Sequence, residues 1–115
     1  MKRLHFKANS DVIKEGDLGD CAYIVETGSL EVSTKNAINE KHILGKLKAN
    51  DIFGELGLID GLPRSATVKT IENCTLNVLT KESFNMLVKN NPEALMPIFK
   101  VLASRLRSTL KQVGG

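Results

Sequence analysis

The sequence predicts a mainly β domain with a terminal α part, an antiparallel β-roll or jelly roll followed by two C-terminal helices. Short runs of alternating apolar and polar residues recur at intervals of about ten residues as far as residue 79, and Gly, Asn and Asp separate them. From Thr80 onward, apolar residues recur instead at every third or fourth position. A chain of 115 residues is long enough for one domain. We therefore expect one domain over residues 1–115, with a β-roll over residues 1–79 and helices over residues 80–113.

The alternation predicts seven strands in the first part of the chain. In order, they cover Leu4–Ala8, Val12–Lys14, Cys21–Glu26, Leu30–Ser33, Lys41–Leu47, Ala66–Thr70 and Cys74–Leu79. The cluster Glu15–Asp20 supplies the Gly and Asp residues that chain reversals need, and Thr27–Ser29 is a hairpin signal with Gly28 at its centre. Tight hairpin turns join antiparallel neighbours, which favours a sandwich or roll.

Two helices are expected after the strands. Thr80 can cap the first, and Asn91-Pro92-Glu93 starts the second with a capping side chain, a proline at the first helical position and an acid in the first turn. Pro97 falls within the first turn and a half of that helix, where it tightens or kinks the start. The expected apolar stripe consists of Leu95, Ile98, Phe99, Leu102, Leu106, Leu110 and Val113. Gly114-Gly115 is expected to end the helix.

Composition and charge limit the classes of ligand that the chain is expected to bind. The formal net charge is +3 at pH 7, which suits an anionic ligand but falls short of the clustered basic face of a nucleic-acid-binding protein. Four Phe, one Tyr and no Trp are too few for a platform on which single-stranded bases stack. We therefore expect no direct nucleic-acid binding by this chain.

The cysteines and the apolar segments point to the cytoplasm. Cys21 and Cys74 lie far apart without a second cysteine or a histidine at metal-ligand spacing, so they are expected to be thiols in a reducing compartment. No apolar run approaches eighteen residues, and the N-terminus has no signal-peptide pattern, so no membrane segment is expected. The acidic residues of Glu15–Asp20 lack the ligand series of a calcium loop, so no metal site is expected.

The segment from Phe53 to Val68 concentrates the residues expected to bind a ligand. Gly54 and Gly57 let the main chain approach a ligand and leave N–H groups uncovered, and a short helix from Glu55 would add the partial positive charge of its N-terminus. Arg64 offers a planar fork of donors for phosphate oxygens. An ionised Glu55 only accepts hydrogen bonds, so its natural partner is a hydroxyl group such as a ribose 2′-OH. The segment predicts a site for a small phosphorylated, hydroxyl-bearing ligand.

A solvated surface loop is the plain alternative, because an isolated Glu or Arg in a loop is usually exposed. The ordered combination of two glycines, a carboxylate and an arginine within sixteen residues favours the ligand site. A Walker-type phosphate loop is not indicated, since no Gly-Lys-Ser or Gly-Lys-Thr follows the glycines.

The order Phe-Gly-Glu-Leu-Gly-Leu, a short Gly/Pro loop and Arg-Ser-Ala-Thr-Val resembles the phosphate-binding cassette of the cyclic nucleotide-binding domain family. That family includes the regulatory subunits of cyclic-AMP-dependent kinase, the bacterial catabolite activator and nucleotide-gated channels. The resemblance covers residues 53–68 without a departure from the family pattern.

The resemblance implies a role for each cassette residue. Arg64 would pair with the cyclic phosphate, Glu55 would take the ribose 2′-OH, and the Gly54 backbone would help to hold the ribose. Backbone N–H groups near Gly57 and the two residues after Arg64 would complete the phosphate cradle. The full set of expected ligand-binding residues is Gly54, Glu55, Leu56, Gly57, Arg64, Ser65, Ala66 and Arg105.

Arg105 belongs to the last helix, which in the family closes over the nucleotide as a lid and in some members pairs with its mate in a homodimer. Arg105 resembles the lid arginine that lies against the purine in nucleotide-gated channels, and a guanidinium stacks readily on a base. The alternatives are an apolar stripe that packs on the β-roll and an arginine on a solvated helix face.

We expect a regulatory module that binds a cyclic purine nucleotide, cyclic AMP in preference to cyclic GMP, and transmits occupancy through its terminal helices. In the family that the cassette resembles, a threonine directly after the phosphate arginine is associated with cyclic GMP preference. Ser65 retains a hydroxyl at that position, but a serine there occurs in cyclic AMP binders too, so the sequence leaves cyclic GMP open. Catalysis is not expected, because no acid–base pair, activated nucleophile or metal cluster is present, and His5 and His42 are expected to face solvent. The alternatives are the sensing part of a catabolite-activator-type transcription regulator, whose effector domain this chain lacks, and an orphan β-roll used for protein contacts.

Overall fold

The computed structural model describes residues 2–112. Val113, the last residue of the expected apolar stripe, and Gly114-Gly115, the expected helix end, lie outside the described residues. The chain divides into two compact units, residues 1–81 and 82–115. The strands and the cassette belong to the first unit, and nearly all of the C-terminal helical residues belong to the second.

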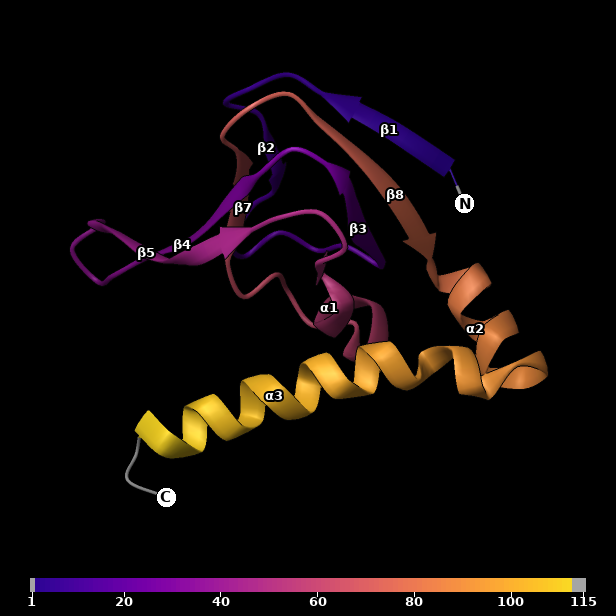
Figure 1. Cartoon of the computed structure of the whole chain (residues 1–115). Coiled ribbons are helices and arrows are strands. Elements are labelled where there is room, and N and C mark those ends of the chain that lie inside the picture. Colours follow the sequence, from indigo (N-terminus) through magenta and orange to yellow (C-terminus); the bar gives the residue numbers. More distant parts are fainter. Residues whose placement is uncertain (1, 113–115) are drawn as a thin grey trace. The chain divides into compact units, whose positions relative to one another are not determined.

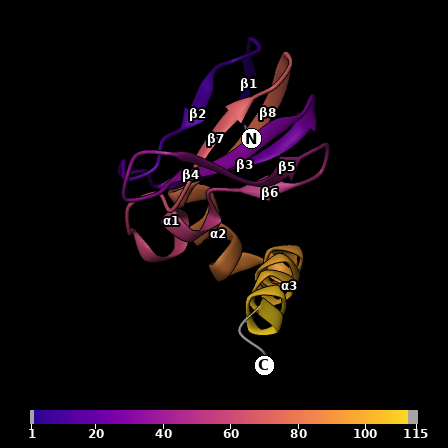
Figure 2. The ribbon, with the colours of Figure 1, turned by 90° about the vertical axis from the view of Figure 1, so that its left-hand side faces the viewer.

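Within residues 2–112, eight strands form two antiparallel four-stranded sheets (Figures 1 and 2). The strands are β1 (Lys2–Phe6), β2 (Asp11–Ile13), β3 (Cys21–Thr27), β4 (Leu30–Lys35), β5 (Lys41–Leu47), β6 (Ile52–Phe53), β7 (Thr67–Thr70) and β8 (Cys74–Thr80). One sheet has the order β1-β8-β3-β6, and the other has the order β2-β7-β4-β5. The mainly β fold class followed by helices is confirmed.

Most strand bounds shift by one or two residues, and the largest differences from the expectation concern β1 and β6. β1 covers Lys2–Phe6 instead of Leu4–Ala8, because antiparallel pairing with β8 fixes its register as far as Phe6, which lies opposite Cys74. The alternation does not predict β6, whose two residues are too few for a pattern and which is a strand only through its pairing with β3.

The core of the first unit draws side chains from both sheets. Its buried members are Val25, Leu30, Leu47, Phe53, Val68, Cys74 and Leu76. In β8, Cys74 and Leu76 are buried and the intervening Thr75 is half-buried, which is the period-two pattern of a strand with one face on the core. The hairpin between β3 and β4 is confirmed at Gly28, which has φ +96° and where a Cβ would lie 2.5 Å from the Cys74 Sγ.

The strand β3 pairs with both β6, which precedes the cassette, and β8, which is the last strand of the β-roll. Tyr23 of β3 lies opposite Phe53 of β6 on one edge and opposite Val78 of β8 on the other edge. The chain passes from β6 into the cassette and from β8 into the helix α2 (Lys81–Asn90). Backbone hydrogen bonds therefore tie β3 to the strands that precede both segments.

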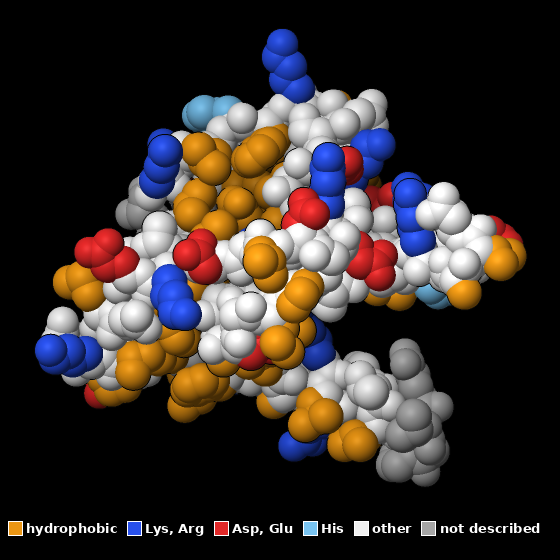
Figure 3. Space-filling model, turned by 180° about the vertical axis from the view of Figure 1, so that it is seen from behind, with side chains coloured by type: hydrophobic (Ala, Val, Ile, Leu, Met, Phe, Trp, Pro, Cys, Tyr) orange, Lys and Arg blue, Asp and Glu red, His pale blue; other side chains and the backbone are white. Residues whose placement is uncertain are grey.

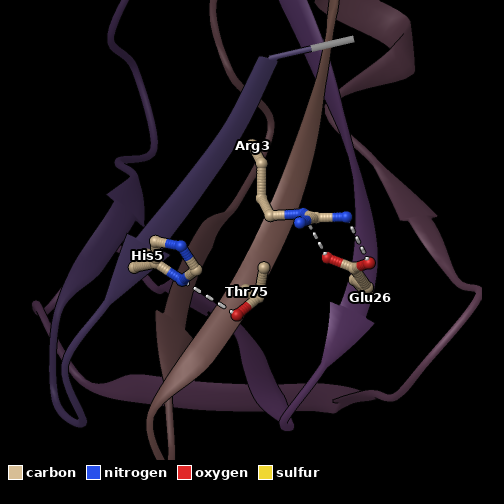
Figure 4. A network of polar contacts seen from close by, with 4 residues as sticks. All are labelled: Arg3, His5, Glu26 and Thr75. Atoms are coloured by element: carbon tan, nitrogen blue, oxygen red, sulfur yellow. Dashed lines mark hydrogen bonds and ion pairs between the residues drawn. The ribbon is translucent and has the colours of Figure 1, made fainter.

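Polar side chains on β1, β3 and β8 contact one another across this sheet (Figure 4). The Arg3 Nε lies 2.8 Å from the Glu26 Oε2, and the Arg3 Nη2 donates to the Glu26 Oε1 at 3.0 Å. The His5 Nδ1 lies 3.0 Å from the Thr75 Oγ1. His5 and His42 are both exposed, as the sequence predicts. On the face shown in Figure 3, Lys and Arg side chains stand among Asp and Glu without forming one continuous basic surface.

The helical unit differs from the expectation in its middle. The chain forms α2 (Lys81–Asn90), a 3-10 turn η1 (Pro92–Leu95) and α3 (Met96–Gln112), whereas the sequence predicts one helix from Asn91. The Ala94 N–H donates to the Asn91 C=O at 3.1 Å, which is the i to i+3 bond of a 3-10 turn. Pro97 is the second residue of α3, where a missing N–H has no intrahelical partner to lose, and this explains why the α-helix starts anew there.

No helix among residues 2–112 has both the length and the apolar character needed to cross a lipid bilayer.

Candidate ligand-binding site

The cassette begins with a strand, a left-handed glycine and a short helix. Gly54 follows β6 with φ 80°, and the helix α1 (Glu55–Asp60) starts directly after it. A Cβ on Gly54 would lie 3.0 Å from the Arg64 Nη1 and 3.2 Å from the Cys21 C=O oxygen, so a side chain there would strain the left-handed backbone and crowd these neighbours. A second left-handed glycine, Gly61, ends α1 and donates its N–H to the Gly57 C=O at 3.0 Å. The short helix expected from Glu55 is confirmed.

Arg64 turns inward and is held by backbone groups. Its side chain is buried, with 7% of the residue exposed, and its Nη1 donates to the Gly54 C=O at 3.0 Å. Its Nη2 points toward the Cys21 Sγ at 3.8 Å. Its own N–H donates to the Asp17 C=O at 2.8 Å, and its C=O accepts from the Gly16 N–H at 2.8 Å. The loop between β2 and β3 therefore anchors the main chain of Arg64 from both sides.

The Arg64 guanidinium is a buried charge without a carboxylate partner in residues 2–112. Arg3 pairs with Glu26, and Lys41 pairs with Glu31. An arginine stays protonated in proteins, and a buried cation is costly unless an anion neutralises it. An anionic ligand beside Arg64 would supply the missing counter-charge.

Glycines form the walls around the guanidinium. A Cβ on Gly19 would lie 2.4 Å from the Arg64 Nη2, and a Cβ on Gly57 would lie 3.0 Å from the Arg64 Nη1 and 2.9 Å from the Gly19 C=O oxygen. Contacts this close leave no room for a side chain while Arg64 keeps this position. Sequence reasoning assigns Gly19 only to a turn, and only the fold reveals its place against Arg64.

The structure brings most of the expected residues into one segment of the first unit. Glu55 is buried, with 1% exposed, and it directly follows Gly54, whose carbonyl holds Arg64. Leu56 and Ser65 are exposed, and Ala66 is half-buried. Arg105 lies in α3, in the other unit, and its proposed contact with a base stays a prediction.

Tyr23 and Phe53 border the Arg64 site, although sequence reasoning assigns Tyr23 no role. Their rings stack with centroids 5.2 Å apart and planes at 19°. Burial raises the pKa of Tyr23 to about 12, a hydrogen bond with the Cys21 thiol acts in the same direction, and the nearby Arg64 charge opposes both. The Tyr23 hydroxyl therefore stays protonated and neutral at physiological pH.

A concave region with a volume of about 420 Å³ lies away from the cassette on the β-roll. Its lining residues are His5, Phe6, Lys7, Thr27, Asn73, Cys74 and Thr75. Several of its polar groups already have partners, because the Asn73 Oδ1 accepts from the Ala8 N–H at 3.0 Å and the His5 Nδ1 lies 3.0 Å from the Thr75 Oγ1. The cassette, with its unneutralised cation, is the stronger candidate. No group of three or more metal-ligating side chains comes together in residues 2–112.

Comparison with protein families identifies a matching family model. Residues 3–91 match the family model described as "Cyclic nucleotide-binding domain". The matched range contains the whole cassette and all eight described strands except the first residue of β1.

Relatives and solved structures agree with this match. The cAMP-activated global transcriptional regulator CRP of Haemophilus influenzae is 38% identical over 109 residues, covering 94% of this chain and 49% of that protein. The Thermus thermophilus catabolite activator protein has a TM-score of 0.93 at 26% identity, covering 98% of this chain and 53% of that one. The EAL enzyme Bd1971 has a TM-score of 0.74 in its cAMP bound form, at 34% identity over 98% of this chain and 30% of that one. Its cGMP bound form has a TM-score of 0.74 at 32% identity, over 96% of this chain and 30% of that one. This chain spans about half the length of the curated regulators that it matches.

Proposed function

The chain belongs to the cyclic nucleotide-binding domain family, and we propose that it binds cyclic AMP in preference to cyclic GMP and transmits occupancy through its C-terminal helices. The matched relative from Haemophilus influenzae is a regulator, and this chain shares the nucleotide-sensing part of such proteins. In this proposal the chain itself has no catalytic activity, and the nucleotide is a regulatory ligand instead of a cofactor.

The buried Arg64 guanidinium is the observation that carries the proposal. It has no carboxylate partner within residues 2–112, and the backbones of Gly19, Gly54 and Gly57 approach it closely. A cyclic phosphate supplies one negative charge and two exocyclic oxygens, which match the charge and the forked donors of one arginine. The buried Glu55 next to Gly54 would accept the ribose 2′-OH.

The proposed ligand-binding set is the one that the family pattern assigns, with the cassette at residues 53–68 in a β-roll of residues 1–79. Its members are Gly54, Glu55, Leu56, Gly57, Arg64, Ser65, Ala66 and Arg105. We propose that helical residues 80–113 respond to the ligand, with Arg105 lying against the purine. A homodimer through α3 and a cytoplasmic location belong to the same proposal.

The preference for cyclic AMP is supported by the matched regulator, which is described as cAMP-activated. Bd1971 has a cAMP bound form and a cGMP bound form, so the fold alone does not select the base. The choice between adenine and guanine then depends on the few side chains that contact the purine. We propose Ser65 and Arg105 as these side chains.

Titration calorimetry on the 115-residue chain tests the proposal. We expect cyclic AMP to bind most tightly, cyclic GMP more weakly, and 5′-AMP most weakly because its open phosphate is not fixed against the ribose. Absence of binding by either cyclic nucleotide would contradict the function and favour an orphan β-roll. Tighter binding of cyclic GMP would contradict only the preference. Slower amide hydrogen exchange in residues 81–112 upon binding would support transmission, and unchanged exchange there would contradict it.

As a second proposal, the chain is the sensing half of a longer transcription regulator. The supporting observation is that the match covers 94% of this chain and 49% of the Haemophilus influenzae regulator. The effector part would then be a DNA-binding helix-turn-helix encoded after residue 115. The continuation of the reading frame tests this proposal, and a continuation without such a motif would contradict it.

A further inference from the structure

We infer that the Cys21 thiol forms part of the wall of the anion site, and that covalent modification of this thiol controls whether the site accepts a phosphate-bearing ligand. The inference rests on the proposed function. It adds a modification site to the cassette, with low-molecular-weight disulfides as the reacting class.

Contacts place Cys21 against the anion site through both its side chain and its backbone. Its Sγ lies 3.8 Å from the Arg64 Nη2. Its C=O oxygen would lie 3.2 Å from a Cβ on Gly54, so the Cys21 backbone approaches the residue that holds the Arg64 Nη1. A group attached to this sulfur would occupy space beside the guanidinium.

The state of Arg64 gives the second, independent observation. Its guanidinium is more than nine-tenths buried, with 7% of the residue exposed, and it has no carboxylate partner within residues 2–112. Its Nη1 is taken by the Gly54 C=O, whereas its Nη2 is directed at the Cys21 sulfur, which is a weak acceptor. The side of the cation left without a strong acceptor is therefore the side that Cys21 borders.

Tyr23 is a further neighbour of the thiol. Burial raises the pKa of Tyr23, Cys21 raises this pKa further and the Arg64 charge lowers it. The Tyr23 ring stacks on Phe53. Because the pKa of Tyr23 is raised to about 12, this neighbour is a neutral phenol that does not repel an anion. The aromatic neighbour of the thiol is thus uncharged.

Cys74 provides a control within the same chain. It is buried, with 3% exposed, and its Sγ donates to the Ser29 C=O at 3.3 Å and to the Glu72 C=O at 3.2 Å. Burial raises the pKa of Cys74, so it stays a protonated thiol, which is a poor nucleophile. Cys21 is half-buried and so offers a reagent a path that Cys74 does not.

The modification is a thiol–disulfide exchange. The Cys21 thiol gives its proton to solvent, and the thiolate attacks one sulfur of the disulfide. The bond between the two reagent sulfurs breaks, and the second half leaves as a thiolate with the electron pair. The product is a mixed disulfide on Cys21, which an added thiol reverses by the same exchange.

The test uses 5,5′-dithiobis(2-nitrobenzoate), whose leaving thiolate absorbs visible light. We expect saturating cyclic AMP to slow the reaction of native protein about tenfold or more, since ligand and reagent compete for one space. Peptide mapping should find the adduct on Cys21. The modified protein should bind cyclic AMP about tenfold or more weakly, and an added thiol should restore the affinity.

Two variants separate the thiols. Cys74→Ala should keep both the reaction and its suppression by cyclic AMP. In Cys21→Ser the reagent should no longer alter the affinity for cyclic AMP. Methyl methanethiosulfonate, which adds only a methylthio group, repeats the measurement if the larger adduct alters the circular dichroism of the protein.

The outcomes distinguish this inference from the proposed function. If calorimetry shows cyclic AMP bound while Cys21 reacts at an unchanged rate and its adduct leaves the affinity unchanged, the inference is overturned and the proposed function stands. An adduct found on Cys74 instead of Cys21 also overturns it. If the unmodified protein binds no cyclic nucleotide, both the proposed function and the inference fail.

Discussion

Two arginines in the β-roll show how differently one side chain is used in two regions. On the sheet of β1, β8 and β3, Arg3 makes two contacts with Glu26 of 2.8 and 3.0 Å, and the side chains are 60% and 36% exposed (Figure 4). In the cassette, Arg64 is buried and its neutral partner is the Gly54 carbonyl. The exposed pair is fully neutralised, although such pairs contribute only about 0–1 kcal/mol to folding.

The difference shows that the sheet neutralises its arginine within the protein, whereas the cassette leaves the charge of its arginine without a carboxylate in residues 2–112. Water and a carboxylate satisfy Arg3, so nothing further is needed there. Arg64 has been removed from water without a carboxylate partner in residues 2–112, which costs free energy unless a ligand restores the charge balance. A residue that costs stability without a ligand and gains a partner with one is expected at a binding site.

The largest effect expected is on nucleotide affinity after Arg64→Ala. The substitution should weaken cyclic AMP binding by several kcal/mol, about a hundredfold or more, because a buried phosphate loses its charged partner. Arg3→Ala should change the affinity by less than about threefold, as it removes only an exposed pair. Calorimetry measures both variants, and equal losses in the two would break the comparison.

A second variant of Arg64 tests whether the buried charge lowers the stability of the protein without ligand. Arg64→Met keeps the length of the side chain and removes the buried charge, so thermal unfolding without ligand should occur at an equal or higher temperature than in the native protein. A marked fall in that temperature would mean that Arg64 contributes to folding as well as to binding.

A smaller effect is expected at Glu55, where one hydroxyl is recognised. Glu55→Ala should remove the preference for cyclic AMP over its 2′-deoxy analogue, a loss of about 1–3 kcal/mol in that difference. The 2′-deoxy analogue itself should bind the variant and the native protein about equally. Glu26→Ala, which removes an exposed carboxylate on β3, is the matched control and should keep the native ratio of dissociation constants. A preference unaltered by Glu55→Ala would remove the ribose role from this residue.

The smallest effect concerns Tyr23, which borders the cassette without carrying a charge. The chain has one tyrosine and no tryptophan, so the ultraviolet absorbance of tyrosinate reports Tyr23 alone. Because burial raises its pKa from 10.0 to about 12, the folded protein should titrate near the higher value and the unfolded chain near the lower one. The stability contributed by the protonated phenol is complete below pH 10 and is lost as the pH rises toward 12.

Tyr23→Phe keeps the ring that stacks on Phe53 and removes the ionisable hydroxyl. Its stability should therefore fall less steeply between pH 10 and pH 12 than that of the native protein. A folded native protein that titrates near pH 10 would show that the Tyr23 hydroxyl lies in water and is not sheltered beside the cassette.

The sequence predicts the fold class because local patterns dictate it. Period-two alternation marks the strands, and the change at Thr80 marks the helices, which are observed from Lys81. What the patterns miss depends on partners far along the chain. The two residues of β6 form a strand only beside β3, and β1 takes its register from β8. The 3-10 turn before Met96 reflects Pro97, for which the sequence predicts a tightened or kinked helix start, but the sequence does not show that the chain forms a separate 3-10 turn there.

The cassette is contiguous in sequence, so its glycines, Glu55 and Arg64 can be identified by their order alone, and their roles in binding stay predictions. The residues that approach Arg64 from β3 and from the loop before it cannot be identified from their order in the sequence. Gly19, Cys21 and Tyr23 reach it only through the pairing of β3 with β6 and through the loop bonds of Gly16 and Asp17 to Arg64. Neither pairing nor loop contacts leave a signal in a single sequence.

Because β3 lies between β6 and β8, hydrogen exchange at its backbone amides reports the opening of either of these two pairings. At Tyr23 and Ile24, where β6 pairs on one edge and β8 on the other, an amide bonded to a neighbouring strand exchanges with deuterium only when that strand separates. Exchange at β3 measured with the cassette empty and occupied would thus report how firmly the chain entering the cassette and the chain leaving for α2 are tied to one common strand.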